Sequence, residues 1–138
     1  IPMKPLLALL LAAASTLALA EPNMDQVPNV LRKPLLGNGL QTAQMNDKGV
    51  LRLQMNKPQV SELTYSSFVF HSICAEQWRH PQEFAQAGLT RVELLNADAS
   101  QGFAFDASGD VCERMGKMGQ KYRELINPRT SACSAKSC

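Results

Sequence analysis

The four cysteines are the residues of this chain whose chemistry is easiest to define. A thiol redox centre usually has a C-x-x-C spacing at the start of a helix, and no such spacing occurs here. Cysteines of an exported protein form disulfides, and four of them allow three pairings. Cys74 and Cys112 lie on the inward stripes of two expected helices, whereas Cys133 and Cys138 are close neighbours near the end of the chain. The pairs Cys74–Cys112 and Cys133–Cys138 are therefore favoured.

Histidine, cysteine and methionine offer a second chemistry, the binding of a copper or zinc ion. The candidate donors of such a site are His71, Cys112, Met115 and Met118. A disulfide would use the sulfur of the cysteine, and methionines at helical spacing commonly belong to a core. We therefore expect no bound metal, and periplasmic metal handling is retained as the alternative function.

No pattern of catalytic residues is recognisable. Ser66, Ser67 and Ser72 flank His71, but the chain has no G-x-S-x-G turn and no acidic residue placed to complete a triad. A phosphate-binding loop and a dinucleotide fingerprint are also missing from the sequence. The sequence therefore favours a protein that binds rather than catalyses, with no cofactor.

The first twenty residues have the pattern of a secretory signal peptide. Lys4 precedes an apolar run over residues 6–14, and an A-x-A pattern follows at Ala18-Leu19-Ala20. The run is short for a membrane span, which needs about 20 apolar residues. We expect residues 1–20 to be cleaved, and we expect the protein to be exported to the bacterial periplasm or the extracellular space without stable insertion in the membrane.

The charge balance argues against two classes of partner. The chain has 14 basic and 12 acidic residues, and removing Lys4 with the signal peptide leaves 13 against 12, a net charge of +1. A balance so near zero does not predict binding to nucleic acid or to an anionic membrane surface.

The 118 residues that remain (138 − 20) are enough for one domain.

The chain after the signal peptide divides into three parts. Residues 21–48 contain repeated prolines and glycines, which predict an extended arm. Residues 49–128 form the expected α+β domain, and residues 129–138 form a polar tail that contains two cysteines.

The domain is expected to be a small α+β structure of two layers in the order β-α-β-β-α. Alternating apolar residues predict about three strands, and two longer apolar stripes with a period of about 3.6 residues predict two helices on one face of the sheet. The expected strands are 50–55, 89–95 and 102–106, the expected helices are 60–78 and 110–126, and a short helical turn and loop are expected over 80–88.

Local signals mark the beginning of each of the two helices. Ser61 is a good N-cap for the first helix, and Asp110 with Glu113 resembles a capping box for the second. Gly116 and Gly119 are unfavourable inside a helix, so we expect them to allow a close approach by another part of the backbone.

The expected function is that of an exported, non-catalytic interaction protein whose partner is another envelope or secreted protein. The arm would supply the anchors, because its prolines limit the entropy lost on binding and its two apolar pairs suit a groove or a sheet edge. These anchor residues are Val30, Leu31, Leu35 and Leu36. The competing explanation is that the same four residues cover the core of the domain itself.

Overall fold

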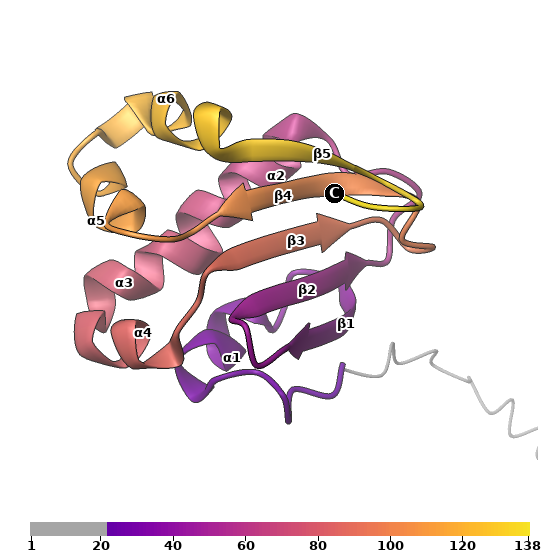
Figure 1. The fold of residues 1–138 in the computed structure, drawn as a ribbon, viewed down its shortest axis with the longest axis horizontal. Helices are drawn as coiled ribbons and strands as arrows, with labels where there is room; N and C mark the ends of the chain where they lie inside the picture. The colour runs from indigo at the N-terminus through magenta and orange to yellow at the C-terminus, as the bar shows by residue number, and fades with distance from the viewer. Residues whose placement is uncertain (1–21) are drawn as a thin grey trace, which may run out of the picture.

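A mixed five-stranded sheet forms the centre of the computed structural model, which describes residues 22–138 (Figure 1). The strands follow one another across the sheet in chain order: β1 (Leu40–Met45), β2 (Val50–Met55), β3 (Arg91–Leu95), β4 (Gln101–Asp106) and β5 (Thr130–Ser134). Only β2 and β3 are parallel, and every other neighbouring pair is antiparallel. The class is therefore α+β, as expected, although the sheet has five strands rather than three.

The two additional strands lie at the edges of the sheet, where sequence patterns are weakest. In β1 the pairing register shifts between Leu40 and Thr42, and this shift disrupts the alternation of apolar and polar residues. β5 consists of small residues and occupies part of the segment 129–138, which was expected to be an unstructured tail. A strand with one free edge and small side chains carries little of the apolar alternation by which strands are predicted.

The segment 21–48 is not an extended arm, because it contains both β1 and a short helix, α1 (Asn29–Leu35). Pro28 precedes this helix as its N-cap residue, and Pro34 comes only in its last turn. Neither proline prevents a helix of two turns, since a proline mainly disrupts the hydrogen bonding of the turn before it. Leu31 and Leu35, four residues apart, are both buried in the core.

The crossover between the parallel strands β2 and β3 contains the longest helical segment, as a parallel pair requires. It comprises α2 (Glu62–Phe68), the π-helical segment η1 (Val69–Cys74) and α3 (Ala75–Arg79), followed by α4 (Pro81–Ala87). The expected helix over 60–78 is confirmed, and the Ser61 hydroxyl accepts a hydrogen bond from the Thr64 N–H at 3.1 Å. Gly88 ends α4 in the left-handed conformation.

The expected helix over 110–126 is divided into α5 (Val111–Met115), the 3₁₀ turn η2 (Gly119–Lys121) and α6 (Arg123–Ile126). A Cβ atom at Gly116 would lie 2.7 Å from Nε1 of Trp78, so this glycine makes room for the indole ring rather than for a backbone. The Asp110 carboxylate does not cap α5 but accepts a hydrogen bond from Nε of Arg114 at 3.1 Å. A 3₁₀ turn, η3 (Asn127–Arg129), leads into β5.

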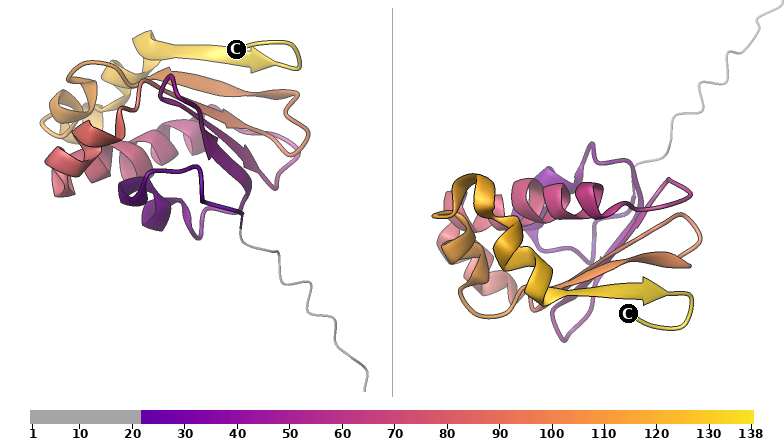
Figure 2. Two further views of the ribbon diagram at one scale, coloured as in Figure 1. Left: turned by 60° about the horizontal axis from the view of Figure 1, so that its bottom comes forward. Right: turned by 90° about the horizontal axis from the view of Figure 1, so that it is seen from above.

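The helices cover one face of the sheet and leave the other open (Figures 1 and 2). Most of the core lies between the helices and the sheet, where inward residues of the central strands such as Leu53, Leu94 and Phe105 are fully buried. The structure has the two disulfides that the sequence favours. Cys74–Cys112 joins η1 to α5 within this core, whereas Cys133–Cys138 joins β5 to the end of the chain.

The expected signal peptide, residues 1–20, lies outside the described residues. In the described part of the chain, residues 22–138, none of the helices is both long enough and apolar enough to span a membrane.

Candidate functional site

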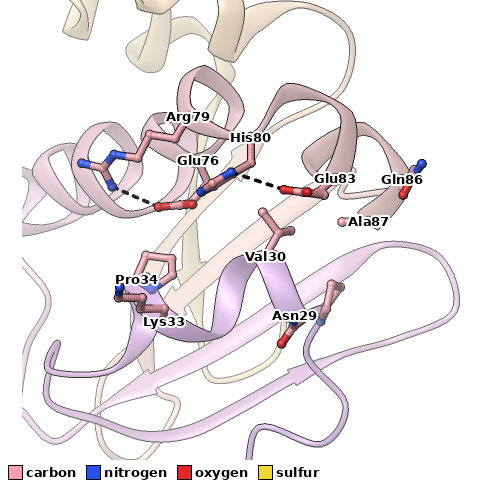
Figure 3. Close-up of a pocket in the computed structure, with 11 residues that line it drawn as sticks. Asn29, Val30, Lys33, Pro34, Glu76, Arg79, His80, Glu83, Gln86 and Ala87 are labelled. Carbon is pink, nitrogen blue, oxygen red and sulfur yellow. Dashed lines mark hydrogen bonds and ion pairs between the residues drawn. The ribbon is translucent and has the colours of Figure 1, made fainter.

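A groove of about 1060 Å³ lies between α1 on one side and α3 with α4 on the other (Figure 3). It brings part of the N-terminal segment together with the second half of the crossover between β2 and β3. These two regions are distant in the sequence, so the groove could not be located from local patterns.

The wall formed by α1 follows from the way this helix packs. Leu31 and Leu35 point into the core, and the residues between and beside them therefore face outward. Val30, Lys33 and Pro34 line the groove from this side. Val30 and Pro34 provide an apolar surface, and Lys33 adds an exposed ammonium group at its edge.

The opposite wall contains charged side chains at helical spacing. The carboxylate of Glu76 accepts a hydrogen bond from the Arg79 guanidinium at 3.0 Å, and Nδ1 of His80 lies 3.3 Å from Oε2 of Glu83. Only 7% of the Glu76 side chain is exposed, whereas the Arg79 side chain is 63% exposed. A buried carboxylate needs a partner of this kind, because burial without one would be unfavourable. Figure 3 shows both pairs above the Val30 and Pro34 side chains.

Lys33 is the positively charged residue of the groove that forms no ion pair. It takes part in none of the ion pairs found among residues 22–138, whereas Arg79 is paired with Glu76 and His80 lies against Glu83. The carboxylate of Glu76 is already buried and paired, so of the two acidic side chains only Glu83 is open to solvent. The groove therefore suits a ligand that carries both an apolar and an acidic group.

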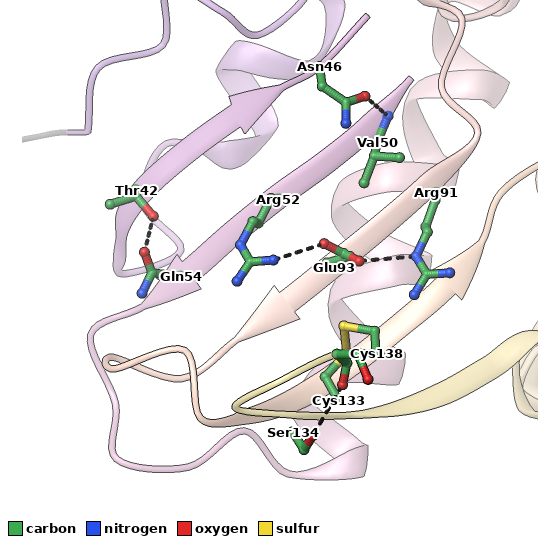
Figure 4. A network of polar contacts seen from close by, with 11 residues as sticks. Thr42, Asn46, Val50, Arg52, Gln54, Arg91, Glu93, Cys133, Ser134 and Cys138 are labelled. Carbon is green, nitrogen blue, oxygen red and sulfur yellow. Dashed lines mark hydrogen bonds and ion pairs between the residues drawn. A yellow bond between two sulfur atoms is a disulfide. The ribbon is translucent and has the colours of Figure 1, made fainter. Parts of the chain in front are cut away.

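The open face of the sheet carries a second polar arrangement (Figure 4). The Glu93 carboxylate on β3 contacts Arg52 on β2 at 3.4 Å and Arg91 on its own strand at 3.1 Å. Next to this row, the Thr42 hydroxyl and the Gln54 side chain are hydrogen bonded at 2.9 Å between β1 and β2. The charged and polar side chains of this face are paired with one another, so we regard it as a solvated surface rather than as the first candidate for a binding site.

Three groups with a perturbed pKa lie outside the groove. Hydrogen bonds from the side chain and the backbone N–H of Ser100 lower the pKa of Asp98, in the turn between β3 and β4. The other two groups, Tyr65 and Asp106, lie near the junction of β4 and β5. Burial raises the pKa of Tyr65 to about 12, although the hydrogen bond with Thr130 acts in the opposite direction. The pKa of Asp106 is lowered, mainly because the side chain and the backbone N–H of Ser108 donate hydrogen bonds to its carboxylate, and Arg129 adds a smaller effect. Both groups stabilise the junction of β4 and β5 and provide no reactive centre.

The residues expected to anchor a partner separate into two groups. Val30 lines the groove, and Leu36 is 43% exposed, so both can reach a partner. Leu31 and Leu35 are buried in the core and are not available as anchors in this structure. For these two leucines, the competing explanation that they cover the core of the domain is the one that agrees with the observed burial.

Two of the four candidate metal donors, Cys112 and Met115, are not available to a metal ion in the fold, whereas His71 is exposed and Met118 is half-buried. The sulfur of Cys112 is bonded to Cys74, and Met115 is completely buried in the core. His71 is exposed, and its ring lies edge-on against Phe70. Residues 22–138 contain no group of three or more His, Cys, Asp or Glu side chains arranged to hold a metal ion.

Sequence reasoning missed the charged wall of the groove. Arg79, His80 and Glu83 come three, four and seven residues after Glu76 in the sequence. Such spacing places side chains on one face of a helix, and this signal was available in the sequence. Their position opposite Lys33 could be known only after α1 had been placed.

Comparisons with protein-family models, curated proteins and solved structures give no significant match to this chain. The function must therefore be argued from the groove and its surroundings.

Proposed function

We propose that this protein is an exported, non-catalytic binding protein that receives a segment of another envelope or secreted protein in the groove between α1 and α3–α4. The segment would present an apolar side chain to Val30 and Pro34, and an acidic side chain to Lys33. The observation that carries this proposal is the groove itself, in which an apolar surface lies beside an exposed lysine that has no ion-pair partner among residues 22–138.

Three further observations support the proposal. The groove is open to solvent rather than enclosed, which suits a chain segment better than a small molecule. Two disulfides are typical of proteins that function in an oxidising compartment. The α1 wall is held by two buried leucines, so the groove is already formed before a partner arrives and little conformational entropy would be lost on binding.

Site-specific photo-crosslinking in the exporting cell tests the location of the site. A photo-reactive residue at Gln86, an exposed residue of the groove, should capture the partner, whereas the same residue at exposed Gln120 on η2 should not. Equal capture at both positions would contradict a site in the groove.

The captured partner then allows a quantitative test of the charge argument. Lys33→Glu replaces attraction to the acidic group by repulsion and should weaken binding about tenfold or more, which is about 1.4 kcal/mol. Lys57→Glu makes the same change at an exposed lysine outside the groove and should leave the affinity unchanged. If the two variants bind equally well, the acidic segment is not recognised by Lys33.

Export is tested separately. Protein recovered from the extracytoplasmic fraction should begin at or near Glu21 when its intact mass and N-terminal sequence are measured. An intact N-terminus in that fraction would contradict cleavage of the signal peptide without affecting the groove.

A further inference from the structure

The two disulfides differ in how well the surrounding structure shields them. Cys74 and Cys112 are 0% and 3% exposed and belong to the main core, where they join η1 to α5. Cys133 is also buried, but its partner Cys138 is only partly buried and belongs to the small cluster of the open face. A thiolate must reach one of the two sulfur atoms to break a disulfide, so access decides which pair can react in the folded protein.

The core disulfide is shielded on both of its sides. The indole Nε1 of Trp78 donates a hydrogen bond to the Cys112 carbonyl at 2.6 Å, and the ring fills the space beside Gly116. On the other side, Cys74 is part of the crossover, and Ile73 next to it is fully buried. A reagent in solution can therefore reach these sulfur atoms only when α5 separates from η1, which requires the main core to open.

The second disulfide closes a turn over residues 134–138 whose hydrogen bonds are local. The Ser134 N–H donates to the Ser137 carbonyl at 2.8 Å, and the Ser134 hydroxyl donates to the same carbonyl at 3.3 Å. The Lys136 N–H donates to Oγ of Ser134 at 3.4 Å. These three bonds take no part in the pairing between β4 and β5, which ends at Ser134. The turn can therefore open while the sheet stays intact.

The turn also carries a positive side chain and no negative one. Lys136 is exposed, and it takes part in none of the ion pairs found among residues 22–138. Figure 4 shows the disulfide of this turn on the open face of the sheet. Reactive cysteines usually lie in partly exposed and electropositive surroundings, because a positive charge favours the thiolate. The surroundings of Cys138 have both properties.

We propose that Cys133–Cys138 is a reversible thiol-exchange site that accepts two electrons from a dithiol, while Cys74–Cys112 stays oxidised. A thiolate of the dithiol attacks Sγ of Cys138, the bond to Cys133 breaks, and the Cys133 sulfur takes up a proton as it leaves. The second thiol of the dithiol loses its proton and attacks the sulfur of the first, which releases Cys138 to be protonated in turn. The dithiol ends as a disulfide, and the pair ends as two thiols.

The partner that this chemistry implies is a dithiol reductant, either a protein or a small molecule. In the oxidising compartment of an exported protein both disulfides stay closed, so the turn opens only on exchange with a dithiol. Opening frees the Ser134 N–H and uncovers Leu95 and Ala104, which form the small cluster with Cys133. The compartment rests on the proposed export, whereas the reactivity of the pair depends neither on export nor on the groove.

Timed reduction of the processed protein with dithiothreitol, without denaturant and followed by alkylation with N-ethylmaleimide, tests the site. Intact mass should show a species with two alkyl groups well before one with four, and peptide mapping should place both groups on Cys133 and Cys138. This pair should react about 100-fold faster or more, because opening the turn breaks only local contacts. Circular dichroism and Trp78 fluorescence of the doubly alkylated species should match those of the oxidised protein.

Two outcomes of this experiment would overturn the proposal. The first is that all four cysteines are alkylated together, or that Cys74 and Cys112 are alkylated first. The second is that the doubly alkylated species has lost the circular dichroism of the folded protein, because the turn would then not open independently of the domain.

Glutathione, a monothiol that forms a mixed disulfide, identifies the sulfur that is attacked. Trypsin cleaves after Lys136 and therefore separates the two cysteines into different fragments. After brief exposure and rapid alkylation, glutathione should be found on Cys138 and the alkyl group on Cys133. The reverse distribution would contradict attack at Cys138.

A charge variant tests the contribution of the turn itself. Lys136→Glu should slow reduction by dithiothreitol about threefold or more, because a negative side chain repels the attacking thiolate. Lys48→Glu makes the same change at an exposed lysine between β1 and β2, at the opposite edge of the sheet, and should leave the rate unchanged. Equal rates for the two variants would contradict the role given to the positive charge.

Discussion

The two faces of the sheet differ in what stabilises them. The face covered by helices holds the main core and the buried disulfide Cys74–Cys112. The open face has only a small apolar cluster, in which Leu95 and Ala104 lie under the disulfide Cys133–Cys138, beside the polar row centred on Glu93. A parallel pair of strands requires a crossover, and the crossover between β2 and β3 places its helices on one face. The stability of the domain should therefore depend mainly on that face.

The largest expected difference in stability between the two faces concerns their disulfides. Replacing Cys74 and Cys112 together by Ala should lower the free energy of unfolding by about 2–5 kcal/mol, because this bond restricts a long loop of the unfolded chain. The two cysteines are 38 residues apart in the sequence. Chemical denaturation of the double variant measures the loss.

The matched control is the replacement of Cys133 and Cys138 together by Ala. These cysteines are five residues apart, and the chain-entropy model gives a contribution of about 2 kcal/mol for so short a loop. A greater loss from this pair than from Cys74 and Cys112 would show that the cluster on the open face is the more important one.

The pH dependence of stability tests the contribution of Tyr65, which is buried on the covered face. Its hydroxyl lies 2.7 Å from Oγ1 of Thr130 and 3.3 Å from the Ala104 carbonyl, and burial raises its pKa to about 12. The folded state therefore favours the neutral phenol, and the contribution to stability is fully present below about pH 10, where an unfolded tyrosine begins to ionise. It should be lost as the pH rises from about 10 to 12, at a cost on the order of 2 kcal/mol.

Unfolding measured at several pH values in this window, with the unaltered protein and with Tyr65→Phe, checks this expectation. The variant loses the hydrogen bonds of the hydroxyl, which lowers its stability by about 1 kcal/mol at neutral pH, but its stability should fall less steeply between pH 10 and 12. Parallel pH profiles for the two proteins would mean that Tyr65 is not responsible for the alkaline loss.

The smallest effect is expected on the open face. Glu93→Gln removes the charge between Arg52 and Arg91, whose side chains are 46% and 37% exposed. The Glu93 side chain is only 13% exposed, but both arginines are more than a third exposed, and ion pairs with such partners contribute little. The free energy of unfolding should therefore fall by less than about 1 kcal/mol, and the difference should decrease as salt is added. If Glu93→Gln lowered the free energy of unfolding as much as the replacement of Cys74 and Cys112 does, the two faces would not differ in their contribution to stability.

The sequence by itself determined the elements whose signals are local. The strand over 50–55, the hairpin that follows Arg91 and the helix that begins after Ser61 were all predictable, because apolar periodicity and capping residues act over one element at a time. The disulfide pairs were predictable for a related reason: two cysteines were on inward helical stripes, and the other two were close neighbours. The prolines of 21–48 were misleading, since their effect depends on where in a turn each one falls.

Only the tertiary structure decided how these elements were combined. β1 and β5 are strands because neighbouring strands offer them hydrogen-bond partners, and not because their own sequences alternate clearly. At the break between α5 and α6, Gly119 is in the left-handed conformation, with a φ of 56°. Beside α5, the Trp78 ring donates a hydrogen bond to the Cys112 carbonyl at 2.6 Å and occupies the space next to Gly116. The groove likewise depends on α1 lying beside α3 and α4, which places Lys33 and Glu76 in the lining of one groove. Contacts of this kind join residues that are far apart in the chain. Their free energy depends on both partners, so it cannot be read from either local sequence.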